Sequence, residues 1–426
     1  MPKKQKRQIA EKLPLVAIEL GSDSVRAIAA EKVGQDMLHI LGYEESAKYS
    51  CVSRGTVVQT SSAGYMIKEL LMLLANRIGL DELPAAFTLV GGESLQIVPI
   101  HAKRDLIRRQ PLTATLMQKL RQECQEKLET KYPNIAVLDL FPSHFVIDGQ
   151  TQENTPSPAQ QGTMIEGHYT AFIGKQDIRQ KIQDSFDRAC RTIEYSFVRP
   201  DALLSAFAFE DPSVLNDGCA VLDLGAQTST LSVYKGNQYL STKMVPYGGY
   251  HLTEAICDWG IPFPIAERIK CEHGAATTDV LERRYMMKIK ATDGSDIRLS
   301  NEQVTQRIAQ HLEKMLAPLL KELNRFAERI RIVYITGGGS MLNGMMEFIQ
   351  ARTPIEVTYG SHATLLDRTT DDEFCSPRYA SLVGALILGS DYRDAHPGKT
   401  IDPPTITGID KITQQVLKLF TDQPNE

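Results

Sequence analysis

The sequence contains little of what marks several large classes of protein. Its 426 residues include one tryptophan, 7% aromatic residues and seven cysteines, and no two cysteines form a Cys-x-x-Cys pair. This odd, scattered set argues against a secreted disulfide scaffold and against a zinc site built from cysteines. It indicates a reducing cytoplasm instead.

Long apolar runs and strong charge are also missing. No stretch approaches the roughly 20 apolar residues that cross a bilayer, and the basic start at residues 3–7 is not followed by the apolar core of a signal peptide. The formal net charge is −5. A charge this small excludes a chain whose main task is to neutralise a nucleic-acid backbone, so no nucleic-acid partner is expected. Neither an HExxH metal motif nor a GxSxG nucleophile motif is present.

Two segments about half a chain apart share one pattern. Residues 15–21 (LVAIELG) and 220–225 (AVLDLG) are apolar strands that end in an acid and a glycine, followed by hydroxyl residues and a second β-like run. Each pattern predicts a β-hairpin, and the repetition predicts a duplicated domain with a cleft between the halves. Superposition of the two patterns pairs Glu19 with Asp223, Gly21 with Gly225 and Ser24 with Thr228.

A third signal lies near residue 337. An apolar strand at 330–335 leads through three glycines into an apolar-periodic stretch at 341–349, which indicates a strand, a tight turn and a helix. Strands alternate with helices elsewhere, so the sequence predicts an α/β fold. Ser300 and Gln303 form a capping box that opens another helix, and Pro318 is expected to kink or break it.

The hairpin turns suit a polyphosphate. Glycines such as Gly21 and Gly225 let backbone N–H groups approach phosphate oxygens, and Ser22, Ser24 and Thr228 supply hydroxyl groups next to them. One such hairpin is common in ordinary proteins, but two copies with a glycine-rich strand-to-helix turn are more specific. We therefore expect a nucleotide site, with a purely structural role of these turns as the alternative.

A metal ion would complete such a site. Magnesium keeps most of its waters, so one or two carboxylates suffice to hold it. Glu19 and Asp223 stand at the ends of the two strands and are the expected metal ligands. The glycines at 337–339 permit close approach of the backbone to a flat or anionic ligand.

These motifs resemble those of proteins with the actin-like fold. Their order along the chain resembles that of the FtsA branch, a family of bacterial cell-division proteins. The segments that carry the resemblance cover nearly the whole chain: 18–22 (IELGS), 222–228, 245–248 (VPYG), 266–270 (AERIK), 335–339 and 379–384 (YASLVG). The resemblance implies duplicated ribonuclease H-type domains around a nucleotide cleft, with an inserted small α+β subdomain.

The resemblance also implies a division of the chain. Lobe I would comprise residues 1–84 and 171–205, interrupted by the inserted α+β subdomain at 85–170. Lobe II would have a core at 206–250 and 331–389, with the return helix to lobe I in the second part, and an outer subdomain at 251–330. A flexible tether at 390–408 and an amphipathic segment at 409–426 would follow.

Further site residues follow only from the resemblance. Glu267 and Lys270 would flank the adenosine of ATP, and Gly337, Gly338 and Gly339 would contact its base, sugar or α-phosphate. From the residues alone, an exposed helical pair at i and i+3 is the favoured interpretation of Glu267 and Lys270. The implied cofactors are ATP and Mg²⁺.

The implied function is that of a cell-division protein on the inner face of the cell membrane at the division site. Such a protein self-associates into a filament, receives the C-terminal peptide of FtsZ on the outer subdomain of lobe II, and meets other divisome proteins. Its C-terminal amphipathic segment would reach the membrane surface. Residues 409–426 of this chain carry Lys411 and Lys418 but also Asp410, Asp422 and Glu426, so a partner-binding helix is the alternative.

One departure from the family pattern concerns catalysis. DnaK-type relatives place an acid before the proline at position 200, near the attacking water, and this chain has Arg199 there. Asp201 is a possible substitute on a different helical face. Since missing catalytic groups cost orders of magnitude, the enzyme assignment stays open, with at most a slow ATPase. A sugar-kinase-type phosphotransferase and a PilM-like pilus-assembly protein are the alternatives.

Overall fold

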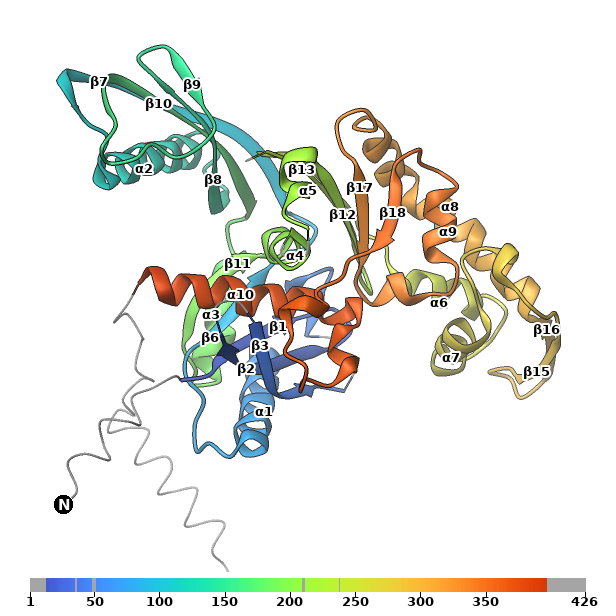
Figure 1. Ribbon diagram of the computed structural model, residues 1–426. Coiled ribbons are helices and arrows are strands. Elements are labelled where there is room, and N and C mark those ends of the chain that lie inside the picture. Colours follow the sequence, from blue (N-terminus) through green and yellow to red (C-terminus); the bar gives the residue numbers. More distant parts are fainter. Residues whose placement is uncertain (1–12, 35–36, 48–50, 209–210, 237, 397–426) are drawn as a thin grey trace, which may run out of the picture.

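The computed structural model describes residues 13–396 except 35–36, 48–50, 209–210 and 237. Two five-stranded sheets share one plan, in which a central strand pairs antiparallel with the next strand and parallel with later strands on its other side (Figure 1). The lobe I sheet has the order β11(Ile193–Val198)-β6(Ala86–Val90)-β1(Leu15–Leu20)-β2(Val25–Val33)-β3(Met37–Glu45). The lobe II sheet has the order β14(Gln238–Val245)-β13(Ser229–Lys235)-β12(Cys219–Leu224)-β17(Ile332–Thr336)-β18(Glu356–Tyr359). The expected α/β duplication is confirmed.

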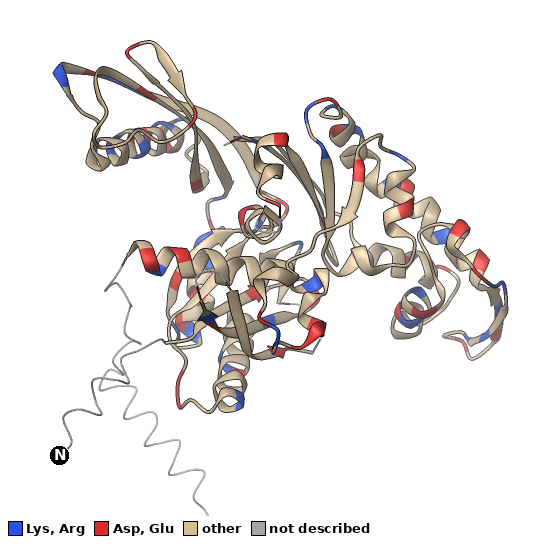
Figure 2. Ribbon diagram, in the orientation of Figure 1, with Lys and Arg blue, Asp and Glu red and all other residues tan. Residues whose placement is uncertain are grey.

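The central strand of each sheet, β1 or β12, is fully buried. All six residues of β1 and all six of β12 are buried, as expected for apolar runs covered on both faces. Charged residues lie mainly on the helices and on the outer hairpin of lobe II (Figure 2). The acids at the ends of β1 and β12 are therefore exceptions that need partners.

Lobe I packs its sheet against α1(Thr60–Ile78), α4(Arg199–Ala208) and α10(Ala380–Ala395), and α3(Ile178–Arg188) packs against α1. Helix α10 comes from the far end of the chain and lies against α4 and β1. It extends to Ala395, so residues 390–395 belong to this helix and not to the expected tether. Arg393 anchors its end to the buried Glu194 carboxylate at 2.6 Å. The rest of the expected tether and the amphipathic segment at 409–426 lie outside the described residues.

Lobe II carries α5(Ser213–Asp217), α6(Gly249–Cys257), α7(Phe263–His273), α8(Asn301–Asn324) and α9(Met345–Gln350), with the hairpin β15(Met286–Lys290)–β16(Asp296–Ser300) at its outer end. The capping box of Ser300 and Gln303 is confirmed. Of the expected kink or break at Pro318, the break is wrong, because α8 runs through it. The ~3 kcal/mol that an interior proline costs is offset by burial of Met315, Leu316 and Leu319 on either side. Among the described residues, no helix has both the length and the hydropathy to span a bilayer.

The inserted subdomain has its own sheet and core. Its strands follow the order β7(Gln96–Pro111)-β10(Gln161–Lys175)-β8(Ile135–Ile147)-β9(Gln150–Gln152), and α2(Ala114–Lys131) packs on one face. It starts later and ends later than the expected range of 85–170. The reason is pairing, since Ala86–Val90 joins β1 and β11 in the lobe I sheet, whereas β10 continues to Lys175.

Candidate functional site: the cleft between the lobes

The two hairpin turns have the same geometry. Gly21 N–H donates to the Ser24 carbonyl at 3.1 Å, and Gly225 N–H donates to the Thr228 carbonyl at 2.9 Å. A Cβ on either glycine would lie within 3 Å of the same carbonyl that its N–H contacts. Only glycine therefore fits this turn, and the sequence pairing of the two copies holds in three dimensions.

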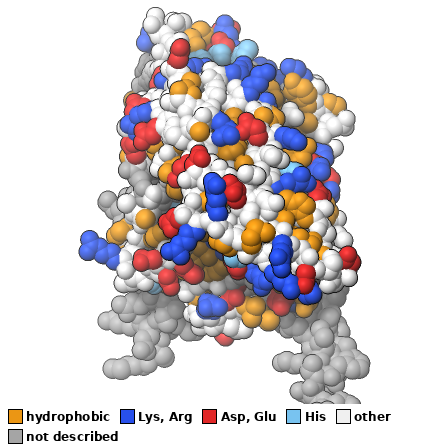
Figure 3. All heavy atoms as spheres, turned by 90° about the vertical axis from the view of Figure 1, so that its right-hand side faces the viewer, with side chains coloured by type: hydrophobic (Ala, Val, Ile, Leu, Met, Phe, Trp, Pro, Cys, Tyr) orange, Lys and Arg blue, Asp and Glu red, His pale blue; other side chains and the backbone are white. Residues whose placement is uncertain are grey.

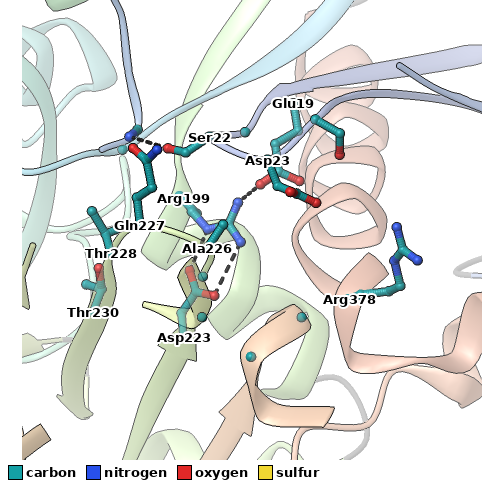
Figure 4. Close-up of a pocket in the computed structure, with 18 of the residues that line it drawn as sticks. Glu19, Ser22, Asp23, Arg199, Asp223, Ala226, Gln227, Thr228, Thr230 and Arg378 are labelled. Carbon is teal, nitrogen blue, oxygen red and sulfur yellow. Dashed lines mark hydrogen bonds and ion pairs between the residues drawn. The ribbon is translucent and has the colours of Figure 1, made fainter. Parts of the chain in front are cut away.

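Both turns open onto one cavity of about 520 Å³ between the lobes (Figure 4). Eleven of the twelve residues expected to hold a nucleotide line it: Glu19, Gly21, Ser22, Ser24, Asp223, Gly225, Thr228, Glu267, Lys270, Gly338 and Gly339. The exception is Gly337, which lies behind the wall with φ 82°, where a Cβ would meet the Asp223 carboxylate at 2.6 Å. Its role is to let the chain pass beside Asp223.

Arg199 occupies the centre of this cavity wall. It is the first residue of α4, and its Nε lies 2.5 Å from one oxygen of Asp223 while its Nη2 lies 3.3 Å from the other. Its Nη1 pairs with Glu19 Oε1. One guanidinium thus bridges the acids of both hairpins. From the sequence, Arg199 was only the residue that replaces a catalytic acid, and nothing in its neighbours indicated this bridge.

The remaining oxygens of these two acids are also engaged. Glu19 Oε2 accepts from Arg26 Nη2 at 2.6 Å and from Ser381 Oγ at 3.0 Å. Both Asp223 oxygens face Arg199, and both acids are buried. In this arrangement Glu19 and Asp223 do not fit a magnesium ion, because a metal and Arg199 would compete for the same oxygens.

Buried Lys270 and half-buried Glu267 form an ion pair at the other end of the cavity. Lys270 Nζ donates to Glu267 Oε2 at 2.8 Å, to the Gly249 carbonyl at 3.0 Å and to Thr253 Oγ1 at 3.0 Å. Only 8% of Lys270 is exposed, so the simple exposed helical pair is ruled out. Such complete pairing is what a lysine needs in order to be buried while charged.

Two more contacts close the cleft from lobe to lobe. Tyr250 Oη of α6 donates to Asp23 Oδ1 at 2.7 Å, and Gln227 Oε1 accepts from Arg54 N–H at 2.8 Å. Burial and the nearby Asp23 raise the pKa of Tyr250, which keeps its hydroxyl a donor. No local pattern indicated these pairs, since each joins side chains from different lobes.

Asp201, the possible catalytic substitute, points elsewhere. It is absent from the cavity wall, and its Oδ1 accepts from Tyr239 Oη at 3.0 Å. Burial raises the pKa of Asp201 to about 7. It is therefore a structural group between α4 and β14, not a base facing the cavity.

Asp201→Asn is expected to remove a pH dependence of stability. The folded pKa lies above the unfolded value near 3.9, so the folded state binds the extra proton and stability falls as pH rises from about 4 to 7. Between pH 5 and pH 8, the wild type should lose on the order of 1–3 kcal/mol more than the variant in urea unfolding. Equal pH profiles for both proteins would contradict this.

Comparison with known proteins finds similarity to one family. The model of the family described as cell division protein FtsA matches residues 220–384. FtsA of Neisseria meningitidis serogroup B is 24% identical over 260 residues, which cover 60% of this chain and 62% of that protein. FtsA of Streptococcus pneumoniae is 20% identical over 346 residues, covering 78% of this chain and 72% of that protein. Over these segments the chain is similar to FtsA.

Solved structures show that the chain has an actin-like fold. The PilM–PilN type IV pilus biogenesis complex superposes with a TM-score of 0.63 at 16% identity, covering 88% of this chain and 98% of that chain. MreB 5 of Spiroplasma citri bound to AMPPNP superposes with a TM-score of 0.55 at 10% identity, covering 90% of this chain and 98% of that chain. The sequence match spans 62% of the length of the Neisseria relative.

Proposed function

We propose that this chain binds an adenine nucleotide in the cleft between its lobes. The observation that carries the proposal is that both glycine hairpins, Gly338, Gly339 and the Lys270–Glu267 pair line one cavity of about 520 Å³. The hairpins would face the phosphates, and the Lys270 end would receive the adenosine. MreB 5, whose structure superposes on this chain, is bound to AMPPNP, which supports a nucleotide as the ligand.

Arg199 would supply the positive charge at the phosphates. A guanidinium matches anionic oxygens in a fixed fork, and in this cleft it already balances Glu19 and Asp223. We propose that the nucleotide binds with Arg199 in this role. Magnesium is the alternative counter-ion, and it would need Arg199 to leave the two carboxylates first.

Turnover in this cleft would be slow or undetectable. Attack of water on a phosphoryl group needs a group that positions the water. The position before Pro200 holds an arginine that is already paired with Glu19 and Asp223, and Asp201 is bound to Tyr239 away from the cavity. The chain would then use nucleotide as a ligand that joins its lobes rather than as a substrate.

Titration calorimetry of the full chain with ATP and with ADP tests the site. One nucleotide should bind per chain, and Lys270→Ala should weaken binding at least tenfold, because it removes the ammonium group that pairs with Glu267 at the adenosine end. The matched control is Lys235→Ala, since Lys235 also belongs to lobe II but lies outside the cavity wall and donates to the Arg329 carbonyl at 2.8 Å. Equal affinity of wild type and Lys270→Ala would refute the site.

A role in cell division follows from the same relationship. We propose that the chain self-associates, meets other proteins of the division machinery and receives the C-terminal peptide of FtsZ on the outer end of lobe II. Figure 3 shows that end, where hydrophobic side chains lie among basic and acidic ones, and Tyr285 and Met286 are exposed there. A surface of this mixture suits a short segment with apolar and acidic residues.

Membrane attachment would come from residues 409–426, at the inner face of the cell membrane. An amphipathic stretch this short would bind weakly by itself, so attachment would depend on many copies in a filament. Comparing liposome flotation of the full chain and of a chain that ends at Gly408 tests this anchor. Equal flotation of the two chains would rule out this membrane anchor and would favour the PilM-like alternative.

A further inference from the structure

Three histidines form a row across the sheet of the inserted subdomain. His168 lies on the central strand β10, directly opposite His101 on β7 and His144 on β8. The ring centroids of His101 and His168 are 5.2 Å apart, and those of His144 and His168 are 4.1 Å apart. The histidines lie in three separate sequence segments, so only the strand register brings them together.

A carboxylate joins this row. Glu166 is two residues before His168 on the same strand and therefore on the same face of the sheet. Its Oε1 lies 2.9 Å from His168 Nε2 and 3.9 Å from His101 Nε2. One ligand atom from each of His101, Glu166 and His168 falls within 4.8 Å of the other two, and no other such group of three metal-ligating side chains occurs in the described part of the chain.

The row stands on the face of the sheet that α2 does not cover. The alternating neighbours Ala102, Phe145 and Tyr169 are buried in the core beneath α2. On the other face, side-chain exposure is 62% for His101, 29% for His168 and 23% for Glu166. The donors are thus accessible from solvent, while their backbone is held in a hydrogen-bonded sheet.

We propose that His101, Glu166 and His168 bind a divalent transition-metal cation, with zinc as the reference ion. Two imidazoles and a carboxylate are a donor set that suits Zn²⁺ and its first-row neighbours rather than Mg²⁺ or Ca²⁺. Neighbouring strands fix the three donors, so binding needs only small side-chain rotations. The open side leaves a position for water or for a ligand from a partner protein.

Calorimetry of the full chain with Zn²⁺ alone, in a buffer that does not chelate, tests the proposal. One ion should bind per chain, and His168→Ala and His101→Ala should each weaken binding by more than tenfold, because even outer-shell partners of a metal are worth about 10–100-fold. Titration with Co²⁺ should give visible absorption bands that both variants lack. Glu166→Gln keeps the shape of the side chain and should weaken binding through the loss of charge alone.

The matched control is His273→Ala. His273 lies 3.7 Å from Glu272 in lobe II, so it offers one imidazole and one carboxylate without the second histidine of the row. Its loss should leave zinc affinity unchanged. The proposal is overturned if the wild type binds no stoichiometric zinc, or if His168→Ala and Glu166→Gln, both folded by circular dichroism, bind zinc as the wild type does.

Discussion

Replacing Arg199 by alanine is expected to destabilise the chain by about 3–5 kcal/mol in the absence of magnesium. The change removes the ion-pair partner of Asp223 and leaves Glu19 with Arg26 as its remaining cation within the described residues. Both carboxylates are buried, and removing one partner of a buried ionic group costs this much. Thermal unfolding in EDTA measures the loss.

Magnesium should act differently on the two proteins. With Arg199 gone, a divalent cation can reach the oxygens of Glu19 and Asp223, so millimolar Mg²⁺ should restore much of the stability of Arg199→Ala. It should leave the wild type nearly unchanged, and ATP binding by the wild type should be similar with and without EDTA. If the wild type needs Mg²⁺ for ATP binding, the metal displaces Arg199 from the two carboxylates, and this prediction is wrong.

The control for this experiment is Arg331→Ala. Arg331 pairs with Asp211 and Asp217, but all three side chains are more than 40% exposed. Exposed ion pairs contribute about 0–1 kcal/mol, so this variant should unfold close to the wild type. A loss as large as that of Arg199→Ala would mean that the burial of Glu19 and Asp223 does not explain the destabilisation.

Gly384→Ala should be the most damaging single-methyl change. Gly384 lies in α10, where a Cβ would come within 1.8 Å of the Ala202 carbonyl oxygen in α4. Both groups belong to helix backbones that pack together, so neither can rotate away and the helices must separate. We expect a loss of about 3 kcal/mol or more in urea unfolding, at or above the usual range for overpacking.

The same variant should also disturb the cleft, because α4 begins at Arg199. Gly338→Ala is the matched glycine control, since its Cβ would meet nothing within 4 Å and its effect should stay within about 0.5 kcal/mol. If Gly384→Ala were as stable as Gly338→Ala, the close packing of α10 on α4 would be wrong.

Much of the fold could be predicted because its signals are local. An apolar run, an acid and a glycine specify each hairpin, and Ser300 with Gln303 specifies the start of α8. Two predictions made from local signals, a break at Pro318 and a tether that starts at residue 390, were wrong for a common reason. At Pro318 and at residues 390–395, burial and the Arg393–Glu194 pair outweigh the local preference of the chain.

The residues of the candidate site also fall into two groups, those that the sequence could predict and those that it could not. The acids and glycines that line the cavity were visible as motifs, whereas Tyr250, Gln227 and Arg26 carried no pattern. Each of these three acts on a group outside its own strand or helix, namely Asp23, Arg54 and Glu19. For Gln227 and Tyr250 the contact joins the two lobes, so no local sequence pattern could predict it.

The sequence by itself determined the duplicated α/β plan, the paired glycine turns and the small insertion, because periodicity and turn chemistry act over a few residues. Only the tertiary structure decided that Arg199 stands between Glu19 and Asp223, and that three histidines meet across β7, β10 and β8. Those groups come from separate segments, and their meeting depends on how helices pack and strands align rather than on any neighbour in the chain.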